Sequence, residues 1–272
     1  MAILVMTVVT ALLVKTFILD ASYIPSRSMT DVLLPGDYVL VNKFLYGART
    51  PLLLSGDHGP LPVVQFPALR DPRRGDILLF WLPSGTGPGG FGATRQFVKR
   101  CVAVPGDTLL IAGGEVRVNG RLAARLEGDT VTSMDIVLPR RGDTVVIGAG
   151  VPAILRGLVV RDRLLQGAGQ RDGGGGLGRR SRDHEGQVSD SAAQPAAGDP
   201  ADTHTVANEF YFVLGDRTSL SLDSRHWGLI PRAWVIGAPI AVYWSAEPGS
   251  PEGGFPGRLR GVRWSRIGHL VR

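Results

Sequence analysis

Short apolar runs separated by turn residues are the feature that most constrains the fold of this chain. Three of them are Tyr38–Val41, Ile77–Trp81 and Phe97–Val104. Runs of about four to eight residues bounded by turn residues are typical of β-strands, whereas helices need longer segments with a period near about 3.6. Similar runs return at 209–214 and 235–244, so the pattern predicts a mainly β protein.

The same turn sequence precedes four such runs. In each, a Gly-Asp pair follows a proline by one or three residues, at Gly36, Gly75, Gly106 and Gly142. Proline presets φ and glycine accepts a positive φ, so we expect turns that lead into strands and have no catalytic role. The glycines are 39, 31 and 36 residues apart, which is too uneven for a regular repeat. Asn119-Gly120, between two short β-like runs, predicts a two-residue hairpin.

The composition excludes a chain that is disordered along its whole length. Of the 272 residues, 44% are hydrophobic, which is enough to bury a sizeable core. The single cysteine, Cys101, excludes an internal disulfide framework and is expected to pack in the core. A net charge of +6 permits an anionic membrane surface or nucleic acid as partner. The positive charge is the only feature of the sequence that would support binding to nucleic acid. We therefore expect no nucleic-acid partner.

The membrane is favoured by the N-terminal segment. Residues 2–19 are apolar except for polar threonines and Lys15, and the segment ends at Asp20. A membrane span needs roughly 20 residues, so this segment is long enough if Lys15 reaches the headgroup layer. We expect residues 1–20 to be a single transmembrane helix. A cleavable secretory signal is the alternative, but the segment has neither a basic start nor a clear small-x-small site.

Other segments are predicted from composition. Residues about 48–70 and 83–94 are Pro/Gly-rich loops, and 165–206 form a flexible Gly-rich insertion. Residues 246–272 are a basic amphipathic tail, whose arginines alternate with apolar residues. This tail either rests on anionic headgroups or packs as an ordinary terminal segment.

Lysine is scarce: of 30 basic residues only Lys15, Lys43 and Lys99 are lysines. Arginine does not lose its proton in a protein, whereas a buried lysine does, so the chemistry reserved for lysine is that of a neutral amine base. Lys99 lies inside an apolar run and is the best candidate.

A neutral lysine would act as a base by deprotonating a serine nucleophile. The Gly-x-Ser-x-Gly, His-Glu-x-x-His, Cys-x-x-Cys, Walker and Ser-x-x-Lys motifs are absent from the sequence. Ser26 and Ser28 follow Pro25 in a β-leaning stretch, and a period of two places both on one face. A lysine deprotonates serine if burial lowers its pKa to about 7 or 8, a shift that costs roughly 4 kcal/mol.

The sequence segments around these residues resemble the conserved boxes of type I signal peptidases, a family of serine proteases with a Ser/Lys dyad. Four boxes occur in the family's order, and the resemblance as a whole reaches from residue 24 to about residue 244. They are Ile24–Met29 followed by 36–44, Arg74–Phe80, Phe97–Asp107, and Gly215-Asp216 with Ser221–Gly228.

The resemblance implies the role of each matching residue. Ser28 is the nucleophile, and Lys99 is the general base. Ser26 joins the backbone N–H of Ser28 in the oxyanion hole. Ser221 orients the lysine amine, and an ion pair between Asp223 and Arg225 braces its loop. The residues expected to wall shallow apolar substrate pockets are Ile24, Pro25, Met29, Phe97 and Val98.

The resemblance also implies the architecture and the reaction. The catalytic core is antiparallel β and comprises 21–110 and 207–245, with an inserted β subdomain at 111–164. The reaction is cleavage of preprotein signal peptides after small-x-small sites through an acyl-serine, without metal or cofactor. The catalytic part lies on the extracytoplasmic side of the cell membrane, although the positive charges after residue 20 would favour the cytoplasm. The oligomeric state is left open.

The chain departs from the family pattern at Arg27, which replaces a small residue between the two serines, and at two further places. Thr30-Asp31 stand where a proline usually follows the nucleophile, and Arg217-Thr218 stand where Asn-Arg usually follow Gly-Asp. Two alternatives therefore stay open. One is a Ser/Lys peptidase that matures a single dedicated partner. The other is an inactive, membrane-tethered β docking module.

Overall fold

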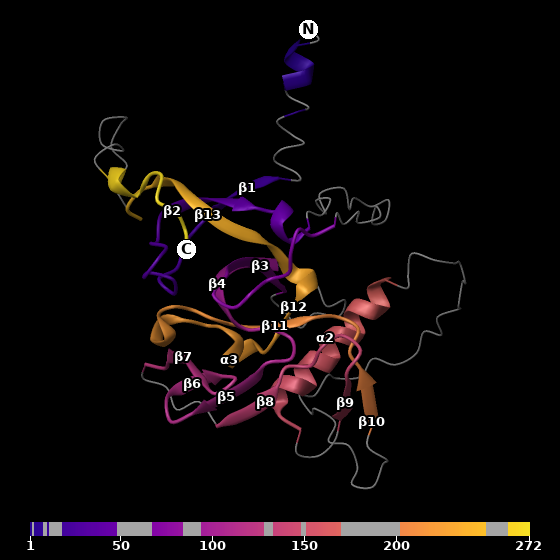
Figure 1. Cartoon of the computed structure of the whole chain (residues 1–272). Helices are drawn as coiled ribbons and strands as arrows, with labels where there is room; N and C mark the ends of the chain where they lie inside the picture. Colours follow the sequence, from indigo (N-terminus) through magenta and orange to yellow (C-terminus); the bar gives the residue numbers. More distant parts are fainter. Residues whose placement is uncertain are drawn as a thin grey trace, which may run out of the picture.

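The structure, a computed structural model, describes residues 1, 3–7, 10, 18–47, 67–83, 94–127, 133–147, 151–169, 202–248 and 261–272. Within these ranges the strands form three antiparallel sheets, which confirms the mainly β prediction. Figure 1 shows the largest sheet between the N-terminus and the smaller inserted sheet.

The largest sheet has seven strands in the order β1-β2-β13-β3-β4-β11-β12. The runs predicted as strands lie within it, and their observed ends differ from the expected ones by at most three residues. Its strands are β1 (Leu19–Tyr23), β2 (Asp37–Asn42), β3 (Ile77–Pro83), β4 (Thr94–Ala103), β11 (Phe210–Leu214), β12 (Ile230–Pro231) and β13 (Val235–Ser245). Strands from both ends of the chain therefore lie side by side.

The four Gly-Asp turns share one geometry, as predicted. Their glycines have φ between 89° and 93°. In the first turn, Asp37 N donates to Leu34 O at 3.0 Å, and the Asp37 carboxylate accepts from Leu34 N at 2.8 Å. The same pair of bonds recurs at Asp76, Asp107 and Asp143. Each turn leads directly into a strand.

We expect Gly36→Ala to unfold the protein far more readily than Gly75→Ala. Both glycines have a positive φ, which costs an alanine about 1–3 kcal/mol. A Cβ at position 36 would also lie 1.9 Å from Ala246 O, whereas a Cβ at position 75 meets nothing within 4 Å. Urea denaturation followed by tryptophan fluorescence measures both losses, and equal losses would contradict this packing.

A separate four-stranded sheet is inserted after β4. Its order is β7-β6-β5-β8, and β6 and β7 form the predicted hairpin with φ of 51° at Asn119 and 77° at Gly120. β9 and β10 pair apart from it. These strands are β5 (Thr108–Ala112), β6 (Glu115–Val118), β7 (Arg121–Arg125), β8 (Met134–Val137), β9 (Thr144–Ile147) and β10 (Asp202–Thr205).

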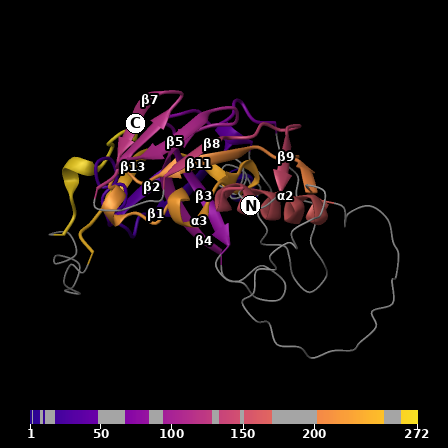
Figure 2. The same ribbon diagram turned by 90° about the horizontal axis from the view of Figure 1, so that it is seen from below.

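The helix α2 (Ala153–Gly169) was not predicted, because 153–164 was assigned to a β subdomain and the rest to the flexible insertion. Figure 2 shows it beside β9. Its apolar residues Ile154, Leu158 and Val159 recur at helical spacing and pack in one core with the inserted sheet and Phe210. The Leu-Val-Val run within it resembles a strand, and tertiary packing overrides that local preference.

A buried carboxylate ties α2 to the segment that returns to the large sheet. Asp162 is fully buried and accepts from Ala207 N at 2.8 Å and from Asn208 N at 3.0 Å. Its Oδ2 also lies 2.7 Å from His204 Nε2. Burial alone would raise the pKa of Asp162, but these hydrogen bonds hold it below its usual value.

The described part of the C-terminal tail packs on the large sheet. Leu270 pairs with Ala241 and Val262 with Ala246 in isolated bridges. Arg266 reaches the fully buried Asp37, and Arg263 donates to Ala246 O at 3.1 Å. These two arginines therefore stabilise the fold, whereas Arg258 and Arg260 lie outside the described residues.

The N-terminal anchor remains a prediction. Residues 3–7 are helical, and 11–17 lie outside the described residues. In the part of the chain that the structure describes, no helix combines the length and the apolar character needed to cross a bilayer.

Candidate active site

Ser28 lies in a tight turn just after β1. Ile24 still pairs with the next strand, since its N–H donates to Asp37 O at 2.9 Å, and Pro25 then ends the pairing. The chain folds back with Leu33 N donating to Met29 O at 2.6 Å. Met29 and Leu33 are 1% and 0% exposed, so their packing fixes the turn and the neighbouring Ser28.

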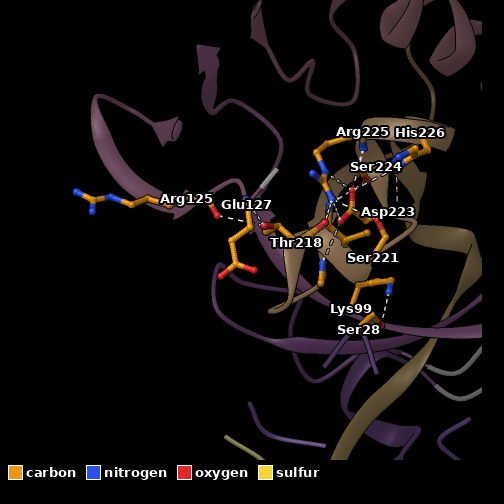
Figure 3. Close-up of polar contacts among 12 residues, drawn as sticks. Ser28, Lys99, Arg125, Glu127, Thr218, Ser221, Asp223, Ser224, Arg225 and His226 are labelled. Atoms are coloured by element: carbon orange, nitrogen blue, oxygen red, sulfur yellow. Dashed lines mark hydrogen bonds and ion pairs between the residues drawn. The ribbon is translucent and has the colours of Figure 1, made fainter. Parts of the chain in front are cut away.

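Lys99 comes from the centre of β4, with Leu78 of β3 directly opposite. Its Nζ donates to Ser28 Oγ at 2.5 Å, across 71 residues of sequence. Both residues are buried, at 3% and 2% exposure. The Ser26 and Ser28 Oγ atoms lie 3.3 Å apart. The fold therefore brings together the serine and the lysine that the sequence singled out (Figure 3).

Burial lowers the pKa of Lys99 to about 8. The charges of Asp223 and Asp216 oppose this effect by favouring the ammonium, and the charge of Arg225 adds to it. Near that pH a large fraction of the amine is neutral, and only the neutral amine accepts a proton. The fraction rises with pH, so the site has a base that works at mildly alkaline pH.

Gly215 allows the following loop to approach the nucleophile. The register of β11 and β4 pairs Leu214 with Arg100, which places Gly215 beside Lys99. A Cβ on Gly215 would lie 2.3 Å from Ser221 Oγ and 2.8 Å from Ser28 O. Arg217 N donates to that same Ser28 carbonyl at 3.1 Å.

Asp223 and Arg225 brace the loop from inside. Their side chains are 0% and 2% exposed, and Arg225 donates from Nε and Nη2 to the two carboxylate oxygens at 2.8 and 3.0 Å. Asp223 also caps helix α3 (Ser224–Trp227) and accepts from Gly215 N at 3.3 Å. Arg225 Nη2 further donates to Ser221 O at 3.2 Å. The bracing role remains a prediction, and these contacts are consistent with it.

Ser221 lies near the dyad but does not bond to it. Figure 3 shows its side chain close to Lys99 and Ser28. Its hydroxyl is buried and has no hydrogen-bond partner among the described residues. The orienting bond to the Lys99 amine, implied by the resemblance, is thus absent from this arrangement, and the role stays a prediction.

The expected substrate-binding residues differ in exposure. Ile24 and Met29 are buried in the core, whereas Pro25 is exposed. Phe97 and Val98 are half-buried on the part of β4 that precedes its pairing with β11, which starts at Arg100. Their role in binding also remains a prediction.

Sequence reasoning missed three contacts that hold the loop. Arg100 donates to both carboxylate oxygens of Asp216, at 2.7 and 2.9 Å. The Arg217 and Asp31 side chains, both departures from the family pattern, lie 3.0 Å apart. Thr218 contacts the end of β7. Asp31, Arg217 and Thr218 depart from the family pattern, which was the only signal in the sequence that these positions differ. Nothing in the neighbouring sequence identifies the residues that they contact.

Comparison with known proteins gives consistent results. The family described as "Signal peptidase, peptidase S26" matches residues 1–244. A signal peptidase I of Pseudomonas aeruginosa is 26% identical over 272 residues, covering 94% of this chain and 73% of that protein. A signal peptidase I of Aquifex aeolicus is 27% identical, covering 90% of this chain and 83% of that protein.

Among solved structures, a signal peptidase I from Enterococcus faecalis is 21% identical and superposes with a TM-score of 0.25. The match covers 63% of this chain and 98% of that one.

Proposed function

This chain belongs to the peptidase S26 family of signal peptidases, a family of serine endopeptidases, and we propose that it cleaves signal peptides from exported preproteins. The observation that supports this most strongly is the buried contact of 2.5 Å between Lys99 Nζ and Ser28 Oγ. A surface lysine would be charged at neutral pH, whereas this amine is poised to act as a base.

The short contact between Lys99 and Ser28 supports the following proposed course of the reaction, in which the oxyanion donors are those implied by the family resemblance. Lys99 Nζ accepts the Ser28 proton while Oγ attacks the scissile carbonyl. The resulting oxyanion accepts hydrogen bonds from Ser28 N–H and the Ser26 hydroxyl, where one such donor contributes about 3–4 kcal/mol. The Lys99 ammonium then protonates the departing amine, which leaves an acyl-Ser28. Lys99 next deprotonates a water that attacks the ester and releases the signal peptide.

The substrate is proposed to bind as an extended strand along residues 94–98 of β4. Backbone pairing on one side of this stretch is made by β3, and pairing with β11 begins only at Arg100. An added strand gains main-chain hydrogen bonds, while side-chain pockets select its residues. The core residues Ile24 and Met29 would form a shallow floor, which suits alanine at the small-x-small positions. We further propose one N-terminal membrane span and an extracytoplasmic catalytic part.

Cleavage of a preprotein with an Ala-x-Ala site tests this function. We expect the purified full chain in detergent to release the mature protein, with its new N-terminus directly after the site. Ser28→Ala is expected to be inactive, because it removes only the attacking oxygen. Phenylalanine in place of the alanine before the cleaved bond is expected to block cleavage. Cleavage that survives in Ser28→Ala, or wild type that cleaves nothing, would contradict the proposal, and the latter would favour a peptidase for one dedicated partner or a docking module.

A further inference from the structure

The loop between Gly215 and Asp223, which we call the catalytic loop, is held mainly by polar contacts. Leu220 and Leu222 are 61% and 62% exposed, so neither anchors the loop in a core. A cavity of about 300 Å³ borders the loop and is lined by Glu127, Thr218, Ser221 and their neighbours. Hydrogen bonds therefore do most to position the loop, and those that reach Glu127 lie beside this cavity.

Thr218 makes two of these bonds with the inserted sheet. Its side chain is buried, and its Oγ1 accepts from Glu127 N at 2.8 Å and donates to Arg125 O at 3.3 Å. Ser219 Oγ adds a more exposed bond to the Glu127 carboxylate at 3.1 Å. Arg125 ends β7, so the edge of the inserted sheet reaches the catalytic loop (Figure 3).

The contacts continue from Thr218 to the dyad. Arg225 Nη2 donates to Thr218 O at 2.6 Å, and the same guanidinium pairs with Asp223. The preceding residue, Arg217, donates its N–H to Ser28 O. One turn of chain therefore contacts the inserted sheet on one side and the surroundings of Ser28 and Lys99 on the other.

We propose that Thr218 is a positioning residue, which uses the inserted sheet to hold the catalytic loop against the Ser28–Lys99 pair. The inference rests on the proposed function for its kinetic readout. Thr218 carries no charge and touches no reacting atom. It acts by fixing the backbone that carries Arg217 and accepts from Arg225.

Loss of this tie would change the environment of Lys99. The charged groups that act on its amine are Asp216, Asp223 and Arg225. Asp216 and Asp223 belong to the catalytic loop. A looser loop admits water, which weakens the burial that lowers the amine pKa. The pKa then moves upward from about 8, so less neutral base is present at a given pH.

The test compares Thr218→Val, which keeps the shape and loses the hydroxyl, with Thr218→Ser, which restores it. We expect kcat near neutral pH to fall about tenfold in Thr218→Val, the effect of one pKa unit, and the acid limb of the pH profile to move to higher pH. Thr218→Ser is expected to match wild type. Thr205→Val, an exposed threonine on β10, is the matched control and should change neither quantity.

Glu127→Pro tests the tie from the other side, because it removes the N–H that donates to Thr218, together with the carboxylate that accepts the more exposed bond from Ser219. We expect the same kinetic change, and no further loss when it is combined with Thr218→Val. The inference is overturned if Thr218→Val keeps the wild-type kcat and pH profile, or if the two variants act additively.

A readout that needs no cleavage separates this inference from the proposed function. The Lys99 pKa can be followed by NMR in protein whose lysines carry carbon-13 at Cε, assigned by its loss in Lys99→Arg. In Thr218→Val we expect it to rise, and an unchanged value would overturn the inference even if wild type proved inactive. A wild type that binds but does not cleave preprotein would count against the proposed function alone.

Discussion

Lys99→Arg is expected to abolish preprotein cleavage, with a fall in kcat of about 10³-fold or more, within the range for loss of a general base. Arginine preserves the positive charge but does not give up its proton, so it cannot accept one from Ser28. The longer guanidinium also has to fit a space in which Nζ and Oγ are 2.5 Å apart. Single-turnover cleavage at mildly alkaline pH, where the wild-type amine is largely neutral, measures the loss.

Lys43→Arg is the matched control. Lys43 Nζ lies 3.6 Å from Asp20 Oδ2, a contact that requires only a cation. This chain uses arginine almost everywhere for that purpose, so Lys43→Arg is expected to cleave at the wild-type rate. An active Lys99→Arg would rule out the neutral amine as base, whatever the behaviour of Lys43→Arg.

Arg225→Met is expected to have the second largest effect, through both stability and pH dependence. Removal of one partner from a buried ion pair typically costs about 3–5 kcal/mol, and both side chains here are at most 2% exposed. The uncompensated Asp223 charge then favours the Lys99 ammonium. We expect a lower midpoint of urea denaturation and an acid limb of the activity profile displaced to higher pH.

The double variant Asp223→Asn, Arg225→Met is the control for this cause. It removes both charges, and Asn still accepts from Gly215 N and caps α3. If the damage in Arg225→Met comes from an unpaired carboxylate, the double variant should be more stable than the single one and its acid limb should return toward lower pH. Losses that simply add would show that the pair does not act as a unit.

Local sequence was sufficient for the parts of the fold that local chemistry decides. The four Gly-Asp turns were predictable because glycine at positive φ and an aspartate that bonds back three residues need no distant partner. The Asn119-Gly120 hairpin was predictable for the same reason. Cys101 is buried as expected, and its burial raises the thiol pKa, which fits core packing rather than reactivity.

Contacts between distant segments were not predictable in this way. Ser28 and Lys99 were paired by family resemblance, since nothing in their separate runs places them together. The Arg100–Asp216 bond joins residues 116 apart, and the bond from Glu127 N to Thr218 joins residues 91 apart. Each depends on how β4, β11 and the inserted sheet come together. Helix α2 was not predicted because it is stabilised by the core on which its apolar face packs, and that core is built from distant segments.

We propose that Lys99 is a neutral base at the pH of the reaction, and direct titration of its amine tests this role. With only three lysines in the chain, carbon-13 labelling at Cε gives three signals, and the one missing in Lys99→Arg belongs to Lys99. We expect this signal to titrate near pH 8, because burial lowers the pKa of Lys99 to about 8. A Lys99 signal that titrates like a solvent-exposed lysine, near about 10.4, would contradict it.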